Sequence, residues 1–315
     1  WTADDLIEFG TVDDATLREK YVDSGVVNLY ADIDMNGKNY TPRENMLYSF
    51  NGWGHTIFNL KTQNAGLFRY IFDPEIVIKG VNLKNVDVTA TESYYSEHYA
   101  GGLIGEMRGG YVIACTVQGK ITALGGYTHD GVGGGIVGKA YRGTIIACSF
   151  VGGFISKNGA IMTGIAGIPG EYDRIYNMNL YGCYSDITLM LDAGGNADFY
   201  YFGIVTSFGI VEGTCEGCYY FDSHPYSNVN GQPKDLGTSC MDGRIKNIEK
   251  LNYAVPADVM SGSNNLNTPI LMWNVNRAPS PKFKCDYHYV KGADVTKDLP
   301  YLVKGVPKDK YYPEI

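Results

Sequence analysis

The chain contains 315 residues and carries a formal net charge of −8, with 44% hydrophobic and 19% charged residues. This acidic balance, without any long basic run, argues against a nucleic-acid-binding surface, because phosphates are neutralised by clustered lysine and arginine. The 40 glycines and 26 tyrosines, with valine, isoleucine and threonine preferred over leucine and alanine, favour strands and turns over helices. The longest apolar segments are interrupted by glycine and too short to cross a bilayer, so we expect no membrane-spanning segment.

The first twenty residues are predicted to form one short helix that caps the end of the fold. Thr2 stands at the N-cap position with Asp5 three residues later, and apolar residues follow near helical spacing. A strand is predicted next over residues 26–35, because apolar and polar residues alternate there.

The segment from Asp32 to Gly37 resembles the start of a calcium-binding loop, D-x-D-x-N-G. The position of the bidentate glutamate that such a loop requires is occupied by Arg43. We therefore interpret the segment as an ordinary turn at the end of a strand. We expect neither a metal site nor a cofactor.

A repeat organises the centre of the chain. Moving residues 101–121 forward by 33 places them on residues 134–154 and aligns eight identical residues. These are Gly101, Gly102, Gly105, Gly110, Ile113, Ala114, Cys115 and Gly119. A fixed period of this length indicates units that stack on their neighbours to bury their apolar faces. Five units are recognisable from residue 66 onward, each with a glycine and two apolar residues followed by a longer strand.

Four cysteines recur at the period of the repeat. They are Cys115, Cys148, Cys183 and Cys218, separated by 33, 35 and 35 residues. Residues at the same place in successive units stack about 4.8 Å apart, so we expect an inward ladder of small buried side chains, with metal or redox chemistry as the alternative. Cys215, Cys240 and Cys285 lie off the ladder, and a Cys240–Cys285 disulfide stays open.

Function is expected on the connections between units, at residues 89–100, 123–132, 156–163 and 192–201, which should line up along one side. The candidate ligand-binding residues are the aromatic residues and the histidine of these connections. They are Tyr94, Tyr95, Tyr99, Tyr127, His129, Tyr200 and Tyr201. Tyrosine offers a flat apolar face with a polar tip, suited to sugar rings or protein hot spots. The alternative is that these side chains only pack on each other.

The motifs GGLIG and GGIVG resemble the GLUG motif of bacterial surface proteins. WTADDLIEF resembles the helix that often precedes such arrays, LYADIDMNG their first strand and turn, and FNGWGHTIFNL their entry coil. The resemblance covers roughly residues 1–283. It implies an all-β fold, a right-handed parallel β-helix (β-solenoid) with a short N-terminal capping helix and a mixed C-terminal cap. We place the cap helix in residues 1–24, the solenoid in 25–222, and the C-terminal cap and tail in 223–315.

The resemblance also implies a non-enzymatic, adhesin-like protein, extracellular or on the outer cell surface, with a lipid anchor through a removed N-terminal signal as one mode of attachment. We expect a monomer whose partner is a polysaccharide or a host or surface protein. The alternatives are a polysaccharide lyase or glycoside hydrolase, and a structural spacer. A catalytic role would need paired carboxylates, and the candidates Asp186, Asp192, Asp198 and Asp222 fall at differing offsets in the repeat.

Overall fold

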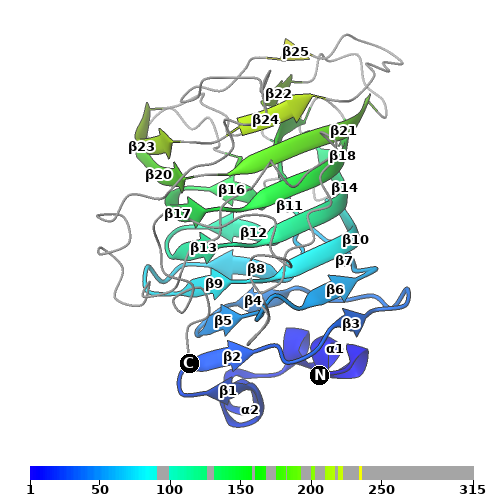
Figure 1. The fold of residues 1–315 in the computed structure, drawn as a ribbon, viewed down its shortest axis with the longest axis vertical. Coiled ribbons are helices and arrows are strands. Elements are labelled where there is room, and N and C mark those ends of the chain that lie inside the picture. The colour runs from blue at the N-terminus through cyan, green and yellow to red at the C-terminus, as the bar shows by residue number, and fades with distance from the viewer. Residues whose placement is uncertain are drawn as a thin grey trace, which may run out of the picture.

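The computed structural model describes residues 1–90, 99–125, 131–157, 160–167, 175–181, 183–192, 200–202, 210–216, 219–222 and 234–235. Two helices, α1 (Ala3–Thr11) and α2 (Asp14–Tyr21), lie at one end, and layers of strands are stacked beyond them (Figure 1). The described strands belong to four sheets.

The first sheet contains, in spatial order, β1 (Val22–Asp23), β2 (Val26–Asn28), β5 (Ser49–Asn51), β9 (Val77–Lys79), β13 (Tyr111–Ile113), β17 (Arg142–Ile146), β20 (Ile175–Tyr181) and β23 (Ile210–Glu216). The second contains β24 (Tyr219–Asp222), β21 (Tyr184–Asp192), β18 (Ser149–Lys157), β14 (Thr116–Leu124), β10 (Asn82–Thr89), β6 (Thr56–Phe58) and β3 (Ile33–Asp34), and β7 (Lys61–Gln63) also pairs with β10. The third contains β11 (Tyr99–Gly101), β15 (Val132–Gly134), β19 (Ile161–Thr163), β22 (Tyr200–Phe202) and β25 (Lys234–Asp235). The fourth contains β16 (Val137–Ala140), β12 (Ile104–Met107), β8 (Phe68–Ile71) and β4 (Arg43–Asn45).

The fold is all-β in character, but the expected right-handed parallel β-helix with a single capping helix is wrong as a description of it. The strands form several sheets in which parallel and antiparallel pairs are mixed, since β1 and β2 are antiparallel. Ser24 and Gly25 join this pair with φ angles of 51° and 82°, the left-handed conformations that a tight hairpin turn requires. The C-terminal cap expected in residues 223–315 lies outside the described residues, apart from 234–235.

The N-terminal helix begins where the sequence predicted and ends earlier. The amide of Asp5 donates to Oγ1 of Thr2 at 3.2 Å, and the amide of Thr2 donates to Oδ2 of Asp5 at 2.7 Å, which is the reciprocal pair of a capping box. The expected single helix over residues 1–20 is wrong, because α1 stops at Thr11. Asp13 then caps α2 by accepting the amide of Thr16 at 2.8 Å.

The 33-residue repeat is confirmed by the strand register. Strands β14 and β18 pair in parallel from Thr116 opposite Ser149 to Leu124 opposite Lys157. The pairs β11–β15, β12–β16 and β13–β17 keep the same offset. Identical residues in the two copies therefore lie beside each other.

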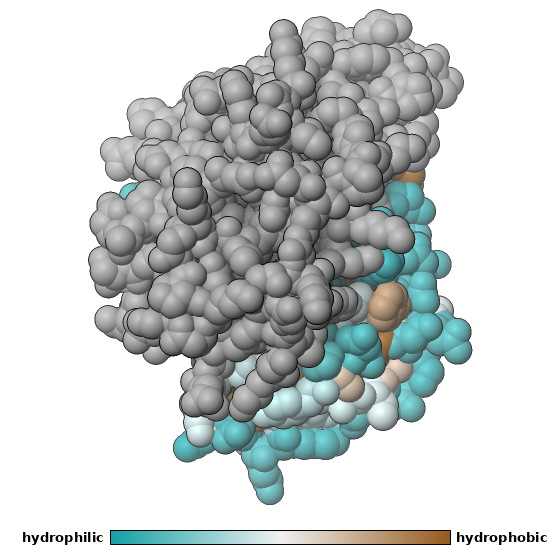
Figure 2. Space-filling view, viewed as in Figure 1, coloured by the Kyte–Doolittle hydropathy of each residue, from teal (hydrophilic) through white to brown (hydrophobic). Residues whose placement is uncertain are grey.

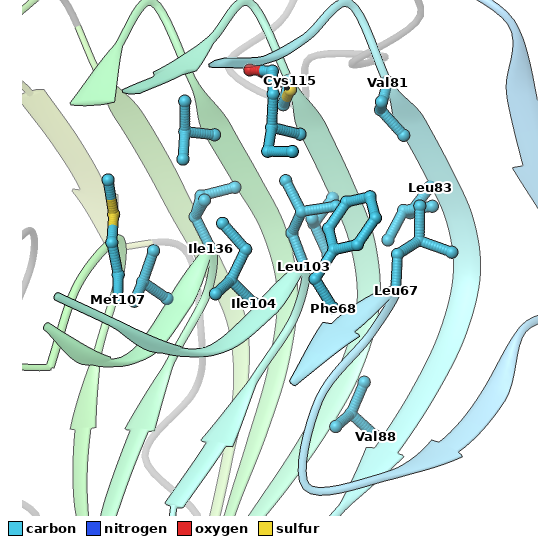
Figure 3. Packing of buried hydrophobic residues seen from close by; sticks show 14 of the residues in the cluster. Leu67, Phe68, Val81, Leu83, Val88, Leu103, Ile104, Met107, Cys115 and Ile136 are labelled. Carbon is cyan, nitrogen blue, oxygen red and sulfur yellow. Dashed lines mark hydrogen bonds between the residues drawn. The ribbon is translucent and has the colours of Figure 1, made fainter. Parts of the chain in front are cut away.

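The interior between the sheets is filled by apolar side chains from successive units, among them Phe68, Leu103 and Cys115 (Figure 3). The cysteine ladder is confirmed for Cys115, Cys148 and Cys183, which are fully buried free thiols. The amide of Cys115 lies 3.5 Å from Sγ of Cys148. Burial, and then the neighbouring thiol, raise the pKa of Cys148 well above its ordinary value. The other cysteines named above, at positions 215, 218, 240 and 285, carry no described side chain.

The glycine that opens each unit marks a close approach of backbones. A Cβ atom on Gly66, Gly102 or Gly135 would lie 2.0, 2.1 or 2.0 Å from the carbonyl oxygen of the glycine one unit further on. No side-chain carbon is accommodated at such a distance. The glycines of the motif are therefore required by the spacing of the units.

A row of side-chain hydrogen bonds joins three early units. Nδ2 of Asn85 donates to Oδ1 of Asn59 at 2.6 Å, and Nδ2 of Asn59 donates to Oδ1 of Asp34 at 2.7 Å. The second bond holds the pKa of Asp34 below its ordinary value. Asn59 and Asn85 have φ angles of 58° and 57°, which asparagine tolerates better than most residues.

We expect Asn59→Ala to lower the free energy of unfolding by about 2 kcal/mol, because it removes both hydrogen bonds and places alanine in a left-handed conformation. The matched control is Asn59→Gly, which loses the same bonds but tolerates the backbone, and should cost about 1 kcal/mol. Urea denaturation of both variants measures the difference. Equal stability of Asn59→Ala and the wild type would contradict a contribution from this row.

Candidate ligand-binding face

The outer side of the fourth sheet carries two rows of side chains. In β8, β12 and β16 the residues Ile71, Met107 and Ala140 are opposite one another and buried in the core. One row precedes these core residues by one position and the other follows them by one position. The first row is Tyr70, Glu106 and Lys139, and the second is Phe72, Arg108 and Tyr141. We call these six residues the aromatic–arginine face.

Two parallel rings form the exposed end of this face. The ring centroids of Tyr70 and Phe72 are 5.4 Å apart, and their planes are inclined by only 14°. Phe72 is 48% exposed and is, with Tyr30 and Leu47, one of the large hydrophobic residues that stand out on the described surface. Where the described surface is visible in Figure 2, it is mostly teal or pale, with a few brown hydrophobic residues. Because each stacked ring covers part of the other, the apolar platform offered to solvent is the exposed Phe72 ring, supported by Tyr70.

Arg108 lies in the middle of its row, next to rings from two other units. Its guanidinium carbon is 5.5 Å from the ring centroid of Phe72 and 4.8 Å from that of Tyr141. Its Nε donates to the carboxylate of Glu106, whose side chain is only 5% exposed, whereas the Arg108 side chain is 47% exposed. Two cation–π contacts and a charge-assisted hydrogen bond therefore hold an exposed guanidinium in one orientation.

The buried end of the face contains a second cation. Lys139 is 3% exposed, its Nζ lies 5.0 Å from the ring centroid of Tyr141, and its backbone is opposite that of Glu106. A buried carboxylate between an arginine and a lysine limits the cost of burying each charge. The face is therefore preorganised by its own charges.

Tyr99 supports the platform from the third sheet. It is 8% exposed in β11 and forms side-chain hydrogen bonds with Tyr70 and Arg69. Burial, followed by the bond to Tyr70, raises the pKa of Tyr99, so its hydroxyl stays protonated at neutral pH. The guanidinium carbon of Arg69 lies 5.2 Å from the Tyr70 ring centroid, and Nη1 donates to Oε2 of Glu44 at 3.1 Å.

The other sequence-predicted binding residues are placed as follows. Tyr94, Tyr95, Tyr127 and His129 lie outside the described residues. Tyr200 and Tyr201 lie in β22, where Tyr201 is opposite Met162. Tyr99 is opposite Val132, and Val132 is opposite Ile161. Ile161 directly precedes Met162, as Tyr200 directly precedes Tyr201. Tyr99 and Tyr200 therefore belong to one row of the third sheet.

The aromatic–arginine face itself was missed at the level of the sequence, although a signal for it exists. Aligning GLFRYIF, GLIGEMR and GIVGKAY from their first glycine puts the two rows at the fifth and seventh positions. The identities of the repeat lie at its glycines and core residues. The face occupies positions at which the units differ.

Several sequence positions bear on metal and catalytic chemistry, and the described residues place them as follows. No group of three or more histidine, cysteine, aspartate or glutamate side chains is placed there to hold a metal ion. The calcium-like segment is a turn in which Asp34 accepts the amide of Asn36 at 2.8 Å, as interpreted from the sequence. In β21 and β24, Asp186 is opposite Phe221 and Asp222 opposite Ile187, so these two candidate acids are out of register. Asp192 ends β21, and Asp198 lies outside the described residues.

Comparison with protein-family models, with curated proteins and with solved structures finds no match to this chain. Among the described residues, no helix combines the length and the apolar character needed to span a membrane.

Proposed function

We propose that the protein is a non-catalytic, adhesin-like surface protein that binds carbohydrate. The observation that carries the proposal is the exposed parallel pair Tyr70 and Phe72 beside a fixed guanidinium. The C–H faces of a sugar ring are apolar and its rim is polar, so a flat aromatic platform edged by hydrogen-bond donors is complementary to it. The resemblance to GLUG-motif proteins supports the same role and an extracellular or outer-surface location, with a polysaccharide or a surface protein as the partner.

The position of the platform also favours binding. Its residues project from, or directly follow, hydrogen-bonded strands and are held by Tyr99, Glu106 and Tyr141. A rigid face loses little conformational entropy when a ligand binds, which raises affinity. The connection predicted at residues 89–100 carries Tyr94, Tyr95 and Tyr99, and the proposal keeps these tyrosines as candidate contacts.

The decisive experiment is a glycan array followed by titration of each bound glycan. We expect Phe72→Ala to weaken binding about tenfold or more, the usual effect of removing a central aromatic contact. The matched control is Tyr30→Ala, which removes an aromatic residue that is 62% exposed elsewhere on the surface, and should leave binding unchanged. Wild-type protein that binds no glycan would contradict the function, whereas equal binding by Phe72→Ala would contradict the site.

A polysaccharide lyase or glycoside hydrolase is the second candidate, and the misaligned Asp186 and Asp222 weigh against it. Incubation with polysaccharides and measurement of reducing ends tests this class directly. Release of reducing ends would replace the binding proposal by an enzymatic one. A structural spacer would bind no glycan, and pull-down experiments would recover the same protein partner each time.

A further inference from the structure

We propose that the ligand is an uncharged, linear polysaccharide whose chain lies across the strands of the fourth sheet, with successive sugars on Leu47 and Phe72. The inference rests on the proposed carbohydrate binding and adds the charge class, the direction and the length of the bound chain. It follows from an extension of the aromatic–arginine face to β4 and from the charges around that face.

Leu47 extends the face by one unit. Strands β4 and β8 pair in parallel with Asn45 opposite Tyr70, and the amide of Met46 donates to the carbonyl oxygen of Tyr70 at 3.2 Å. Met46 is buried in the core, whereas Leu47 after it is exposed. The same register, continued by two residues, puts Leu47 opposite Phe72 in the outer row.

The two apolar side chains form a continuous floor. Leu47 is 47% exposed and Phe72 is 48% exposed. Neighbouring strands of a sheet are about 4.8 Å apart, which is close to the length of one hexose in an extended chain. Two consecutive sugars can therefore place their apolar faces on Leu47 and Phe72 at the same time, provided that the chain runs across the strands.

The exposure of the row sets the length of the bound segment. The side chain of Arg108, which follows Phe72 in the row, is 47% exposed, whereas Tyr141 beyond it is 7% exposed. Three successive positions of the row therefore reach solvent. We infer that a segment of about three sugars covers them, at one sugar for each strand spacing.

Polar groups flank the floor on both sides. The exposed Asn45 precedes Leu47 by two positions, and the exposed Asp73 directly follows Phe72. Oδ1 of Asp73 accepts the amide of Glu75 at 2.8 Å, which fixes the carboxylate in the turn. A carboxylate accepts hydrogen bonds from hydroxyl groups, and an amide both donates and accepts. The hydroxyl groups of an uncharged sugar therefore find partners at the edges of the floor.

The charges on and beside the face cancel. The cations are Arg69, Arg108, Lys139 and Arg142, and the anions are Glu44, Asp73, Glu75 and Glu106. Glu44, Asp73 and Glu75 are exposed and belong to the units of Leu47 and Phe72. Four cations against four anions give no local excess that would attract a polyanion to a chain of net charge −8. The face therefore favours an uncharged chain over an acidic one.

The first test titrates the wild type with linear glucose, mannose and galactose oligosaccharides of increasing length. We expect affinity to rise up to about three sugars and then to level off, since three positions of the row are exposed. Leu47→Ala should weaken the binding of these longer chains about fivefold, because it removes half of the apolar floor. Leu47→Met, which retains an apolar side chain, and Tyr30→Ala are the controls and should bind as the wild type does.

The second test compares each bound polysaccharide with its C6-oxidised form, in which the primary alcohols have become carboxylates. The oxidised form should bind about tenfold more weakly, because each added carboxylate meets the exposed acids around Phe72. Asp73→Asn keeps an acceptor for the Glu75 amide and removes one charge, so it should narrow this difference. Binding of the uncharged form should not change with salt concentration, since no ion pair is made.

The outcomes separate this inference from the proposed function. Affinity that is independent of chain length, or equal binding of the longer chains by Leu47→Ala and the wild type, would overturn a chain lying across the strands. Tighter binding of the oxidised form would overturn the charge class. Each of these results leaves carbohydrate binding intact, whereas binding of no glycan at all would overturn both.

Discussion

Replacing Gly102 by alanine is expected to lower the free energy of unfolding by about 3 kcal/mol, the upper range of overpacking effects. The added Cβ atom would lie 2.1 Å from the carbonyl oxygen of Gly135 and 2.8 Å from Cγ1 of Val117. The nearest atom belongs to the backbone, so the clash cannot be relieved by rotating a side chain. Two neighbouring units must move apart, and a close-packed interior loses contacts when they do. Chemical denaturation of the wild type and the variant measures the difference.

The control for this experiment is Gly37→Ala. Gly37 has a φ of 79°, and a Cβ atom there would meet nothing within 4 Å. This variant therefore carries only the cost of a left-handed alanine, about 1 kcal/mol. If Gly102→Ala were no less stable than Gly37→Ala, the close approach of the units would not explain the repeated glycine.

The stacking of the units could be predicted from the sequence because the same residues are required in each copy. Gly102 recurs as Gly135 where backbones approach, and Cys115 recurs as Cys148 at a fully buried position. Because each unit has the same packing requirements, the same residue types recur in the sequence at a fixed period. The register of β14 on β18 follows directly from them.

The local departures from this pattern could not be predicted because their residues carry weak signals. Ser24 adopts a φ of 51° in the hairpin between β1 and β2, although serine is not a typical residue for that turn. Ala114 and Ala147 also have φ angles of 51°, and alanine gives no indication of a left-handed corner. The expected fold class was wrong in part because the antiparallel pair of β1 and β2 depends on the turn at Ser24. The break between the two helices carries no such residue, since Val12 and Asp13 have φ angles of −62° and −66°.

The candidate site was missed because its residues, unlike the glycines and cysteines of the core, do not recur from unit to unit. Binding residues differ between units, as Phe72 and Arg108 do, so a search for identities passes over them. Tyr99 was predicted as a ligand contact on the basis of its residue type, but the sequence does not reveal that it is buried beneath Tyr70 and Arg69. Reading the outer positions of aligned units, instead of the connections alone, would have found the face.

The second large effect is expected at Arg43, which attaches the N-terminal helices to the fourth sheet. Its side chain is 6% exposed, Nη1 donates to the carbonyl oxygen of Val12 at the end of α1, and Nη2 donates to Oδ1 of Asp14 at 2.6 Å. Arg43→Ala should lower the free energy of unfolding by about 3 kcal/mol, because it removes two hydrogen bonds between the sheet and the helices and leaves a cavity where the buried stem packed. Lys20→Ala, which removes a more exposed ion pair with Glu8, should cost under about 1 kcal/mol.

Arg43→Met distinguishes the hydrogen bonds from the packing, because methionine retains an unbranched apolar stem but donates nothing. Hydrogen exchange locates the effect: amides of α1 and α2 should lose protection in Arg43→Ala while those of β14 and β18, several units away, keep theirs. A uniform loss of protection would mean that the helices and the strands unfold as one unit. Arg43 occupies the position at which a calcium loop would need its glutamate, so the residue by which the segment departs from that motif is the one that holds the helices on the sheet.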